Sequence, residues 1–109
     1  MLREIKESDW KIFRELRLVA LDRFCRRILD ETAAIVTESD GGRSPHDCYL
    51  ALFKLLEKRD GDLADAFNNP RRSSALLQLR LICAHNLLTP EELARFSEET
   101  QSIIEFLNK

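Results

Sequence analysis

Long apolar runs are absent from this sequence. Leu18 to Leu21 and Leu81 to Ala84 are typical apolar stretches, with four residues each. A helix needs about 20 apolar residues to cross a bilayer, and the first residues also lack the apolar stretch of a signal peptide. We therefore expect a protein that does not enter membranes and that is located in the cytoplasm.

An excess of charge of one sign is also absent. The chain has 17 basic and 19 acidic residues among 109, which gives a net charge of −2. Neither half is strongly basic, and this balance argues against a dedicated nucleic-acid binder. The 44% of hydrophobic and 33% of charged residues exclude a disordered chain. The length fits a single domain that covers 1–109.

Signatures of catalysis and of metal binding are missing as well. The sequence has no catalytic motif of the Ser-His-Asp or Cys-His type and no glycine-rich phosphate loop. Two His-Cys pairs are each two residues apart, whereas neighbours on one helix face are three or four apart. We therefore expect no enzyme activity, no metal and no cofactor. The three widely spaced cysteines, which are interpreted as reduced core thiols, are Cys25, Cys48 and Cys83.

Apolar residues recur at helical spacing nearly throughout the chain, and no stretch alternates with period two. The pattern predicts an all-α, single-domain bundle of four to five helices. The first helix is long, from a cap at Ser8 to about Ile35. A loop follows at 37–43. The second helix starts at Pro45 behind the cap residue Ser44.

The second half of the chain has clear start and stop signals. The third helix is expected from Pro70, after the cap Asn69, to about His85. It is largely apolar and therefore central. The sequence Thr89-Pro-Glu-Glu predicts the next start, and Ser97 divides the remainder into two short helices. The second predicted helix keeps one apolar face through Gly61, formed by Tyr49, Leu52, Phe53, Leu56, Leu63 and Phe67.

Four charged residues fall within the apolar stripes of these helices: Arg14, Arg17, Asp60 and Arg80. Three interpretations stay open. The arginines can extend their charged ends to water along apolar stems, and Asp60 can turn to solvent at Gly61. Alternatively, Arg17 and Asp60 form an interior ion pair. As a third possibility, the four residues line a site in which the arginines bind an anion such as a carboxylate or phosphate.

A second contact surface is suggested by Ile12 and Val19, which lie opposite the main apolar stripe of the first helix. Single apolar residues at a surface are also common. We expect homodimerisation, or binding of a protein partner, through this helix. The function predicted is a non-catalytic protein-interaction or regulatory module that self-associates. The alternative is a small-anion or metabolite binder that uses the interior arginines.

Overall fold

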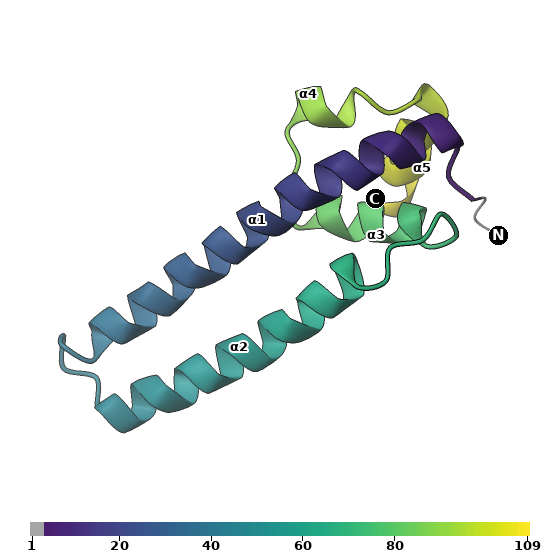
Figure 1. Cartoon of the computed structure of the whole chain (residues 1–109). Coiled ribbons are helices and arrows are strands. Elements are labelled where there is room, and N and C mark those ends of the chain that lie inside the picture. The colour runs from purple at the N-terminus through teal and green to yellow at the C-terminus, as the bar shows by residue number, and fades with distance from the viewer. Residues whose placement is uncertain (1–3) are drawn as a thin grey trace.

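The computed structural model describes residues 4–109, and within them the fold is all-α (Figure 1). This confirms the predicted all-α, single-domain class with a long N-terminal helix. Neither of the two long helices has the apolar stretch that a membrane crossing requires. The helices of the described chain are α1 (Glu7–Glu38), α2 (Pro45–Phe67), α3 (Ala75–Ala84), α4 (Pro90–Leu93) and α5 (Glu98–Leu107).

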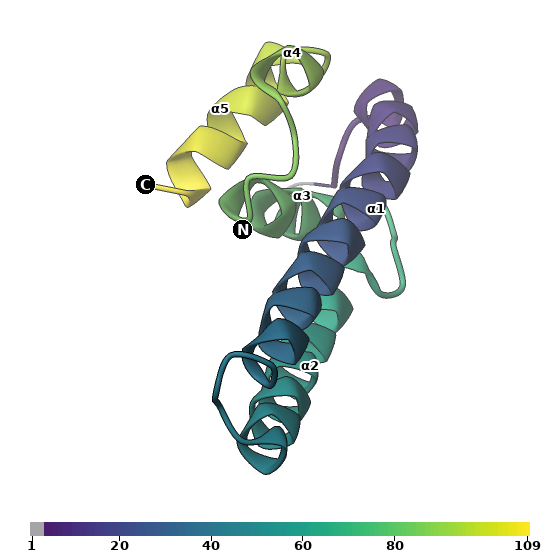
Figure 2. The same ribbon diagram turned by 90° about the vertical axis from the view of Figure 1, so that its left-hand side faces the viewer.

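The molecule consists of a head and a projecting helical hairpin. In the hairpin, α1 and α2 run antiparallel and are joined by a loop at residues 39–44 (Figure 1). The head contains α3, α4 and α5 beside the N-terminal half of α1 (Figure 2). The overall extents are 52 × 25 × 25 Å. The outer part of the hairpin therefore projects beyond α3, α4 and α5.

The hydrophobic core lies in the head. Phe24 is completely buried and contacts the rings of Phe67 and His85, with centroids 6.3 Å and 4.9 Å away. The short helix α3 contacts α1, α2 and α5, which confirms its predicted central position. Leu79 and Ile82 of α3 are each 1% exposed. Outside the head, α2 is poorly covered, and its fully buried residues are only Cys48, Ala66 and Phe67.

Most helix starts agree with the sequence. The hydroxyl of Ser44 accepts a hydrogen bond from the backbone N–H of Asp47, at 3.1 Å. At α4, Thr89 and Glu92 form the expected capping box with bonds of 2.8 Å and 3.1 Å. The hydroxyl of Ser97 caps α5. These predictions are confirmed because each motif satisfies N–H groups of the first helical turn locally.

Two boundaries differ from the prediction. The helix α1 begins at Glu7, so Ser8 lies inside it and is not its cap. The third helix begins at Ala75 rather than at Pro70, because residues 71–74 form a turn. Asn69 has a left-handed backbone with φ 47° and ends the preceding segment instead of capping the next one. The predicted left-handed end of the third helix at Asn86 is confirmed, with φ 57°.

Candidate functional site

The four charged residues singled out by the sequence do not converge. Arg14, Asp60 and Arg80 are exposed, and only Arg17 is partly buried. The predicted interior pair of Arg17 with Asp60 is wrong. Arg17 contacts Phe67, which lies two helical turns or about 10 Å beyond Asp60 along α2. A shared anion site that includes Asp60 and Arg80 is therefore not assembled.

Two of these arginines instead bind the carbonyl ends of helices. Arg17 donates a hydrogen bond to the carbonyl of Phe67, the last residue of α2, and its guanidinium carbon lies 5.9 Å from the Phe67 ring. Arg80 donates to the carbonyl of Leu107, the last residue of α5, at 3.3 Å. None of the helices α2, α3 and α5 has a basic residue in its own last turn. Arginines from other helices thus satisfy carbonyls that lack intrahelical partners.

The most deeply buried charge is one that the sequence analysis did not single out. Asp9 is 1% exposed. Its carboxylate accepts hydrogen bonds from the backbone N–H of Ser97 at 2.9 Å, from the Ser97 hydroxyl at 2.6 Å and from the Thr100 hydroxyl at 2.7 Å. Burial opposes ionisation, but these hydrogen bonds outweigh it and lower the pKa of Asp9. One signal was available, because Asp9 shares a helix face with Phe13, Leu16 and Ala20.

The segment that contains α4 is attached to α1 by paired charges. Both oxygens of Glu92 accept hydrogen bonds from Arg23, at 2.6 Å and 3.0 Å. These bonds and the N–H of Thr89 lower the pKa of Glu92 to about 2. Just after α4, Arg95 forms an ion pair with Glu15 of α1 at 2.8 Å. These contacts join the α4 segment to α1.

Candidate chemical groups elsewhere are not assembled into a centre. Burial raises the pKa of the Cys83 thiol to about 11, so that it remains protonated at neutral pH. Within residues 4–109, no three His, Cys, Asp or Glu side chains are placed together so as to hold a metal ion.

Most of the exposed large apolar side chains of the described chain lie on the hairpin. Six large side chains of α1 and α2 project from it with exposed fractions between 44% and 62%. Their spacings of three, four, seven and eleven residues place them along one side of each helix. We call this surface the open face, and it consists of Leu18, Leu29, Val36, Tyr49, Phe53 and Leu56.

Grooves between the two helices show that both contribute to the same side of the hairpin. Val36 and Tyr49 line one groove, of about 220 Å³. Phe53 and Leu56 line a second groove together with Ile28, of about 540 Å³. The sequence correctly placed Tyr49, Phe53 and Leu56 on one helix face. It was wrong in treating that face as covered, since only two helices are present along this part of the chain.

The surface expected for partner binding, Ile12 with Val19, is not free. Ile12 packs against the hydrophobic core, and Val19 is partly buried. Leu18, Leu29 and Val36 of the open face lie on another side of the same helix, about a quarter turn or more from Ile12 and Val19. Partner binding through Ile12 and Val19 stays a prediction, and the open face is the more exposed apolar surface of this helix.

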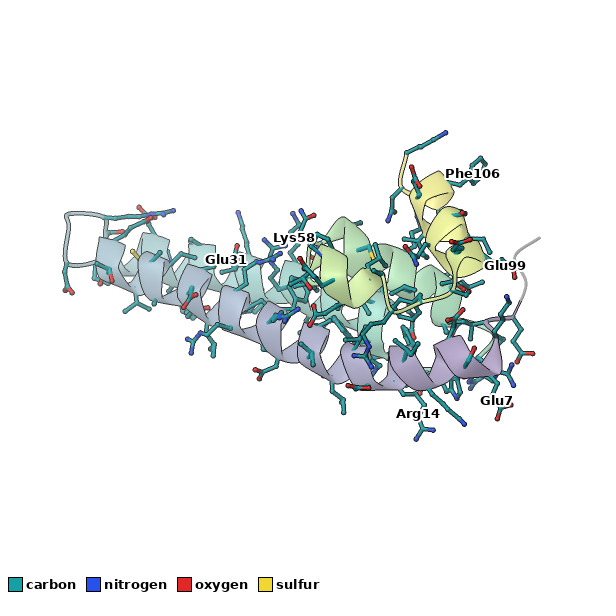
Figure 3. All side chains as sticks on the ribbon, turned by 90° about the horizontal axis from the view of Figure 1, so that it is seen from above. Glu7, Arg14, Glu31, Lys58, Glu99 and Phe106 are labelled. Atoms are coloured by element: carbon teal, nitrogen blue, oxygen red, sulfur yellow. The ribbon has the colours of Figure 1, made fainter. Side chains whose placement is uncertain are left out.

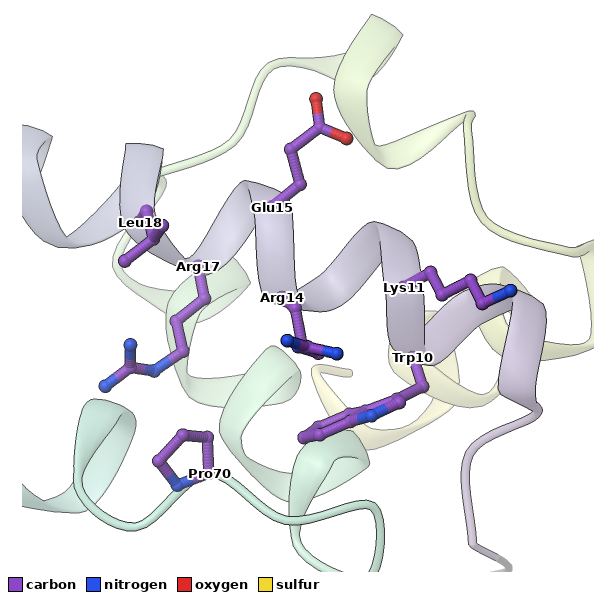
Figure 4. A pocket seen from close by; sticks show the side chains of 7 residues that line it. All are labelled: Trp10, Lys11, Arg14, Glu15, Arg17, Leu18 and Pro70. Atoms are coloured by element: carbon purple, nitrogen blue, oxygen red, sulfur yellow. The ribbon is translucent and has the colours of Figure 1, made fainter.

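At the head end of the open face lies a basic groove of about 670 Å³ (Figure 4). It is lined by Arg14 and Arg17 together with Trp10 and Pro70. Glu15 also contributes to its lining, but its carboxylate points away from the two guanidinium groups. The guanidinium of Arg14 has no hydrogen-bonding or charged partner in the described part of the chain. It projects from the side of α1 that faces away from α5 (Figure 3).

Comparisons with protein-family models, with curated proteins and with solved structures find no match to this chain.

Proposed function

We propose that this chain is a non-catalytic protein-interaction module that self-associates through the open face of its hairpin. The observation that carries the proposal is the row of Tyr49, Phe53 and Leu56 on α2, which are 62%, 56% and 44% exposed. Large contiguous apolar patches are rare on monomers and are typical of interaction sites. Aromatic side chains in such a patch contribute strongly to binding.

The surface area supports a missing partner. The chain exposes 7251 Å², whereas a compact monomer of 12.7 kDa exposes about 6200 Å². The excess of roughly 1000 Å² is similar to the area that each partner contributes to a standard interface. The radius of gyration of 16.8 Å also exceeds the value of about 13 Å for a compact chain of this length.

A second copy of the chain is the partner that this surface fits. A two-fold axis would place the apolar side chains of the open face against those of the same face in the other copy. Two hairpins packed in this way form a four-helix bundle, in which each helix covers the face that is bare in the single chain. An apolar strip is complementary to itself in this arrangement, and no other chain is needed to bury it.

The free thiols are consistent with a site of action in the cytoplasm. Cys25, Cys48 and Cys83 are unpaired in the structure, and the cytoplasm keeps thiols reduced. We therefore propose that the chain acts in the cytoplasm. Oxidation of Cys48, which is buried beneath the groove of Val36 and Tyr49, would disturb the surface on which self-association depends.

Sedimentation equilibrium of the purified chain tests the proposal. The wild type is expected to be a dimer, and Phe53→Glu is expected to weaken the dimer at least a hundredfold, because two buried aromatic side chains are replaced by charges. Phe53 is exposed in the single chain. The variant should therefore keep the wild-type helical circular dichroism spectrum.

The matched control is Phe106→Glu on α5. Phe106 is 71% exposed and lies in the head, away from the open face (Figure 3). This variant should remain dimeric. A wild type that stays monomeric at high micromolar concentration would overturn the proposal, and so would a Phe53→Glu variant that dimerises as strongly as Phe106→Glu.

A further inference from the structure

The two ends of the open face have opposite charge. At the head end, Lys11, Arg14 and Arg17 line the basic groove. Each is three residues from the next on the same helix, so their like charges repel one another. Glu15 also lines the groove, but its carboxylate is held by Arg95. The groove therefore has a surplus of positive charge.

The other end of the open face is the tip of the hairpin, at residues 38–47. It contains the carboxylates of Glu38, Asp40 and Asp47 and a single arginine, Arg43. Arg43 forms an ion pair with Glu38. The side chain of Asp40 is exposed and has no ion pair in the described part of the chain. The tip therefore has a surplus of negative charge.

The spacing of these two ends matches the symmetry of a dimer. The open face extends along α1 from Leu18 to Val36, about 27 Å at 1.5 Å per residue. A two-fold axis midway between these residues, lying in the plane of the interface and perpendicular to the helices, exchanges the level of Leu18 with that of Val36. The same axis exchanges the level of Arg14 with that of Asp40, because each lies four positions beyond the corresponding end.

We infer that two copies pack antiparallel, so that the acidic tip of each hairpin lies in the basic groove of the other. This inference rests on the proposed self-association and adds its orientation and its polar contacts. The apolar open face lies between two symmetric charged contacts, one at each end. Trp10 and Pro70 form the walls of the groove that receives the tip (Figure 4).

The parallel arrangement is disfavoured by the same charges. With the two-fold axis along the hairpin, each basic groove would face the other basic groove and each acidic tip the other tip. Like charges brought together at an interface reduce affinity and select against that arrangement. In the antiparallel arrangement each basic groove faces an acidic tip, so both contacts are attractive.

Charge reversal provides the test, with the dissociation constant measured by sedimentation equilibrium at low ionic strength. Arg14→Glu is expected to weaken the dimer by about tenfold, because both symmetric contacts become repulsive. Asp40→Arg should have a similar effect. The chain with both substitutions should dimerise nearly as strongly as the wild type, since it restores opposite charges at both ends. Arg71→Glu, an exposed arginine outside the basic groove, is the matched control and should leave the dissociation constant unchanged.

The outcomes separate this inference from the proposed function. A dimer that is lost in Phe53→Glu but unaffected by Arg14→Glu and Asp40→Arg would overturn the antiparallel arrangement and leave self-association intact. Failure of the double variant to recover would also overturn it. If phosphate raises the melting temperature of the wild type but not of Arg14→Glu, while dimerisation is unchanged, the groove binds a small anion and not the tip. A monomeric wild type would instead remove the proposed function itself.

Discussion

Asp9 accepts hydrogen bonds from both the backbone N–H and the hydroxyl of Ser97, which lies 88 residues further along the chain. The first bond occupies an N–H at the start of α5 that the helix itself cannot satisfy. The carboxylate also carries the charge that a helix N-terminus favours. One residue of α1 thus fixes where the last helix of the head begins.

Replacement of Asp9 should therefore destabilise the head. Asp9→Asn keeps the shape of the side chain but loses the charge, and one of its polar atoms becomes a donor that faces other donors. We expect a loss of roughly 2 kcal/mol in the free energy of unfolding, measured by urea denaturation. Glu7→Gln, an exposed change in the same turn of α1, should cost almost nothing. Equal stability of the two variants would show that the buried carboxylate is not an anchor.

Stability should fall in acid for a related reason. Asp9 and Glu92 both have a lowered pKa in the folded state, about 2 for Glu92 against an ordinary value of 4.5. Their contribution to the free energy of unfolding is complete above the ordinary pKa and is lost as the pH falls from about 4.5 toward 2. The urea midpoint of Phe53→Glu, in which unfolding is not coupled to dissociation, should decrease over this interval. Addition of Glu92→Gln should make the decrease smaller, and an unchanged slope would contradict the assignment.

The two glycines at Gly61 and Gly42 should respond in opposite ways to alanine. Gly61 lies inside the unbroken helix α2, and a Cβ there meets no atom within 4 Å. Gly61→Ala should stabilise the chain by about 0.5–1 kcal/mol. Gly42 has φ +109° in the hairpin loop, so Gly42→Ala should destabilise it by about 1 kcal/mol. The melting temperatures of both variants test these expectations. A Gly61→Ala variant that is no more stable than the wild type would contradict an unbroken helix at Gly61.

Local signals in the sequence were sufficient for the helices. Ser44 before Pro45 and Thr89 before Pro90 mark helix starts because a side chain and an N–H three residues later satisfy each other. The left-handed residue Asn86 was predictable for a similar local reason. Ser8 was misassigned because it resembles a cap, although Lys6 holds that position.

Features that depend on the arrangement of helices were not predictable. Helical phase placed Arg17 on the core face, yet its partner is a carbonyl, which every residue carries and no sequence pattern marks. In the same way, the apolar face of α2 gave no sign that it would lie beyond the reach of the head. Phe53 has the same pattern as a core residue and differs only in that nothing in the single chain covers it.

The arginines that bind helix ends also link the short helices of the head to their neighbours. The helices α3 and α5 have 10 residues each, and isolated helices of this length are marginal in water. Arg27 of α1 donates to the carbonyl of His85, which follows α3, at 2.7 Å, and Arg80 of α3 donates to the end of α5. The carbonyl end of α3 is therefore bound by an arginine of α1, and the carbonyl end of α5 by an arginine of α3. The head should therefore unfold in a single cooperative step, and no short helix of the head should persist once α1 is lost.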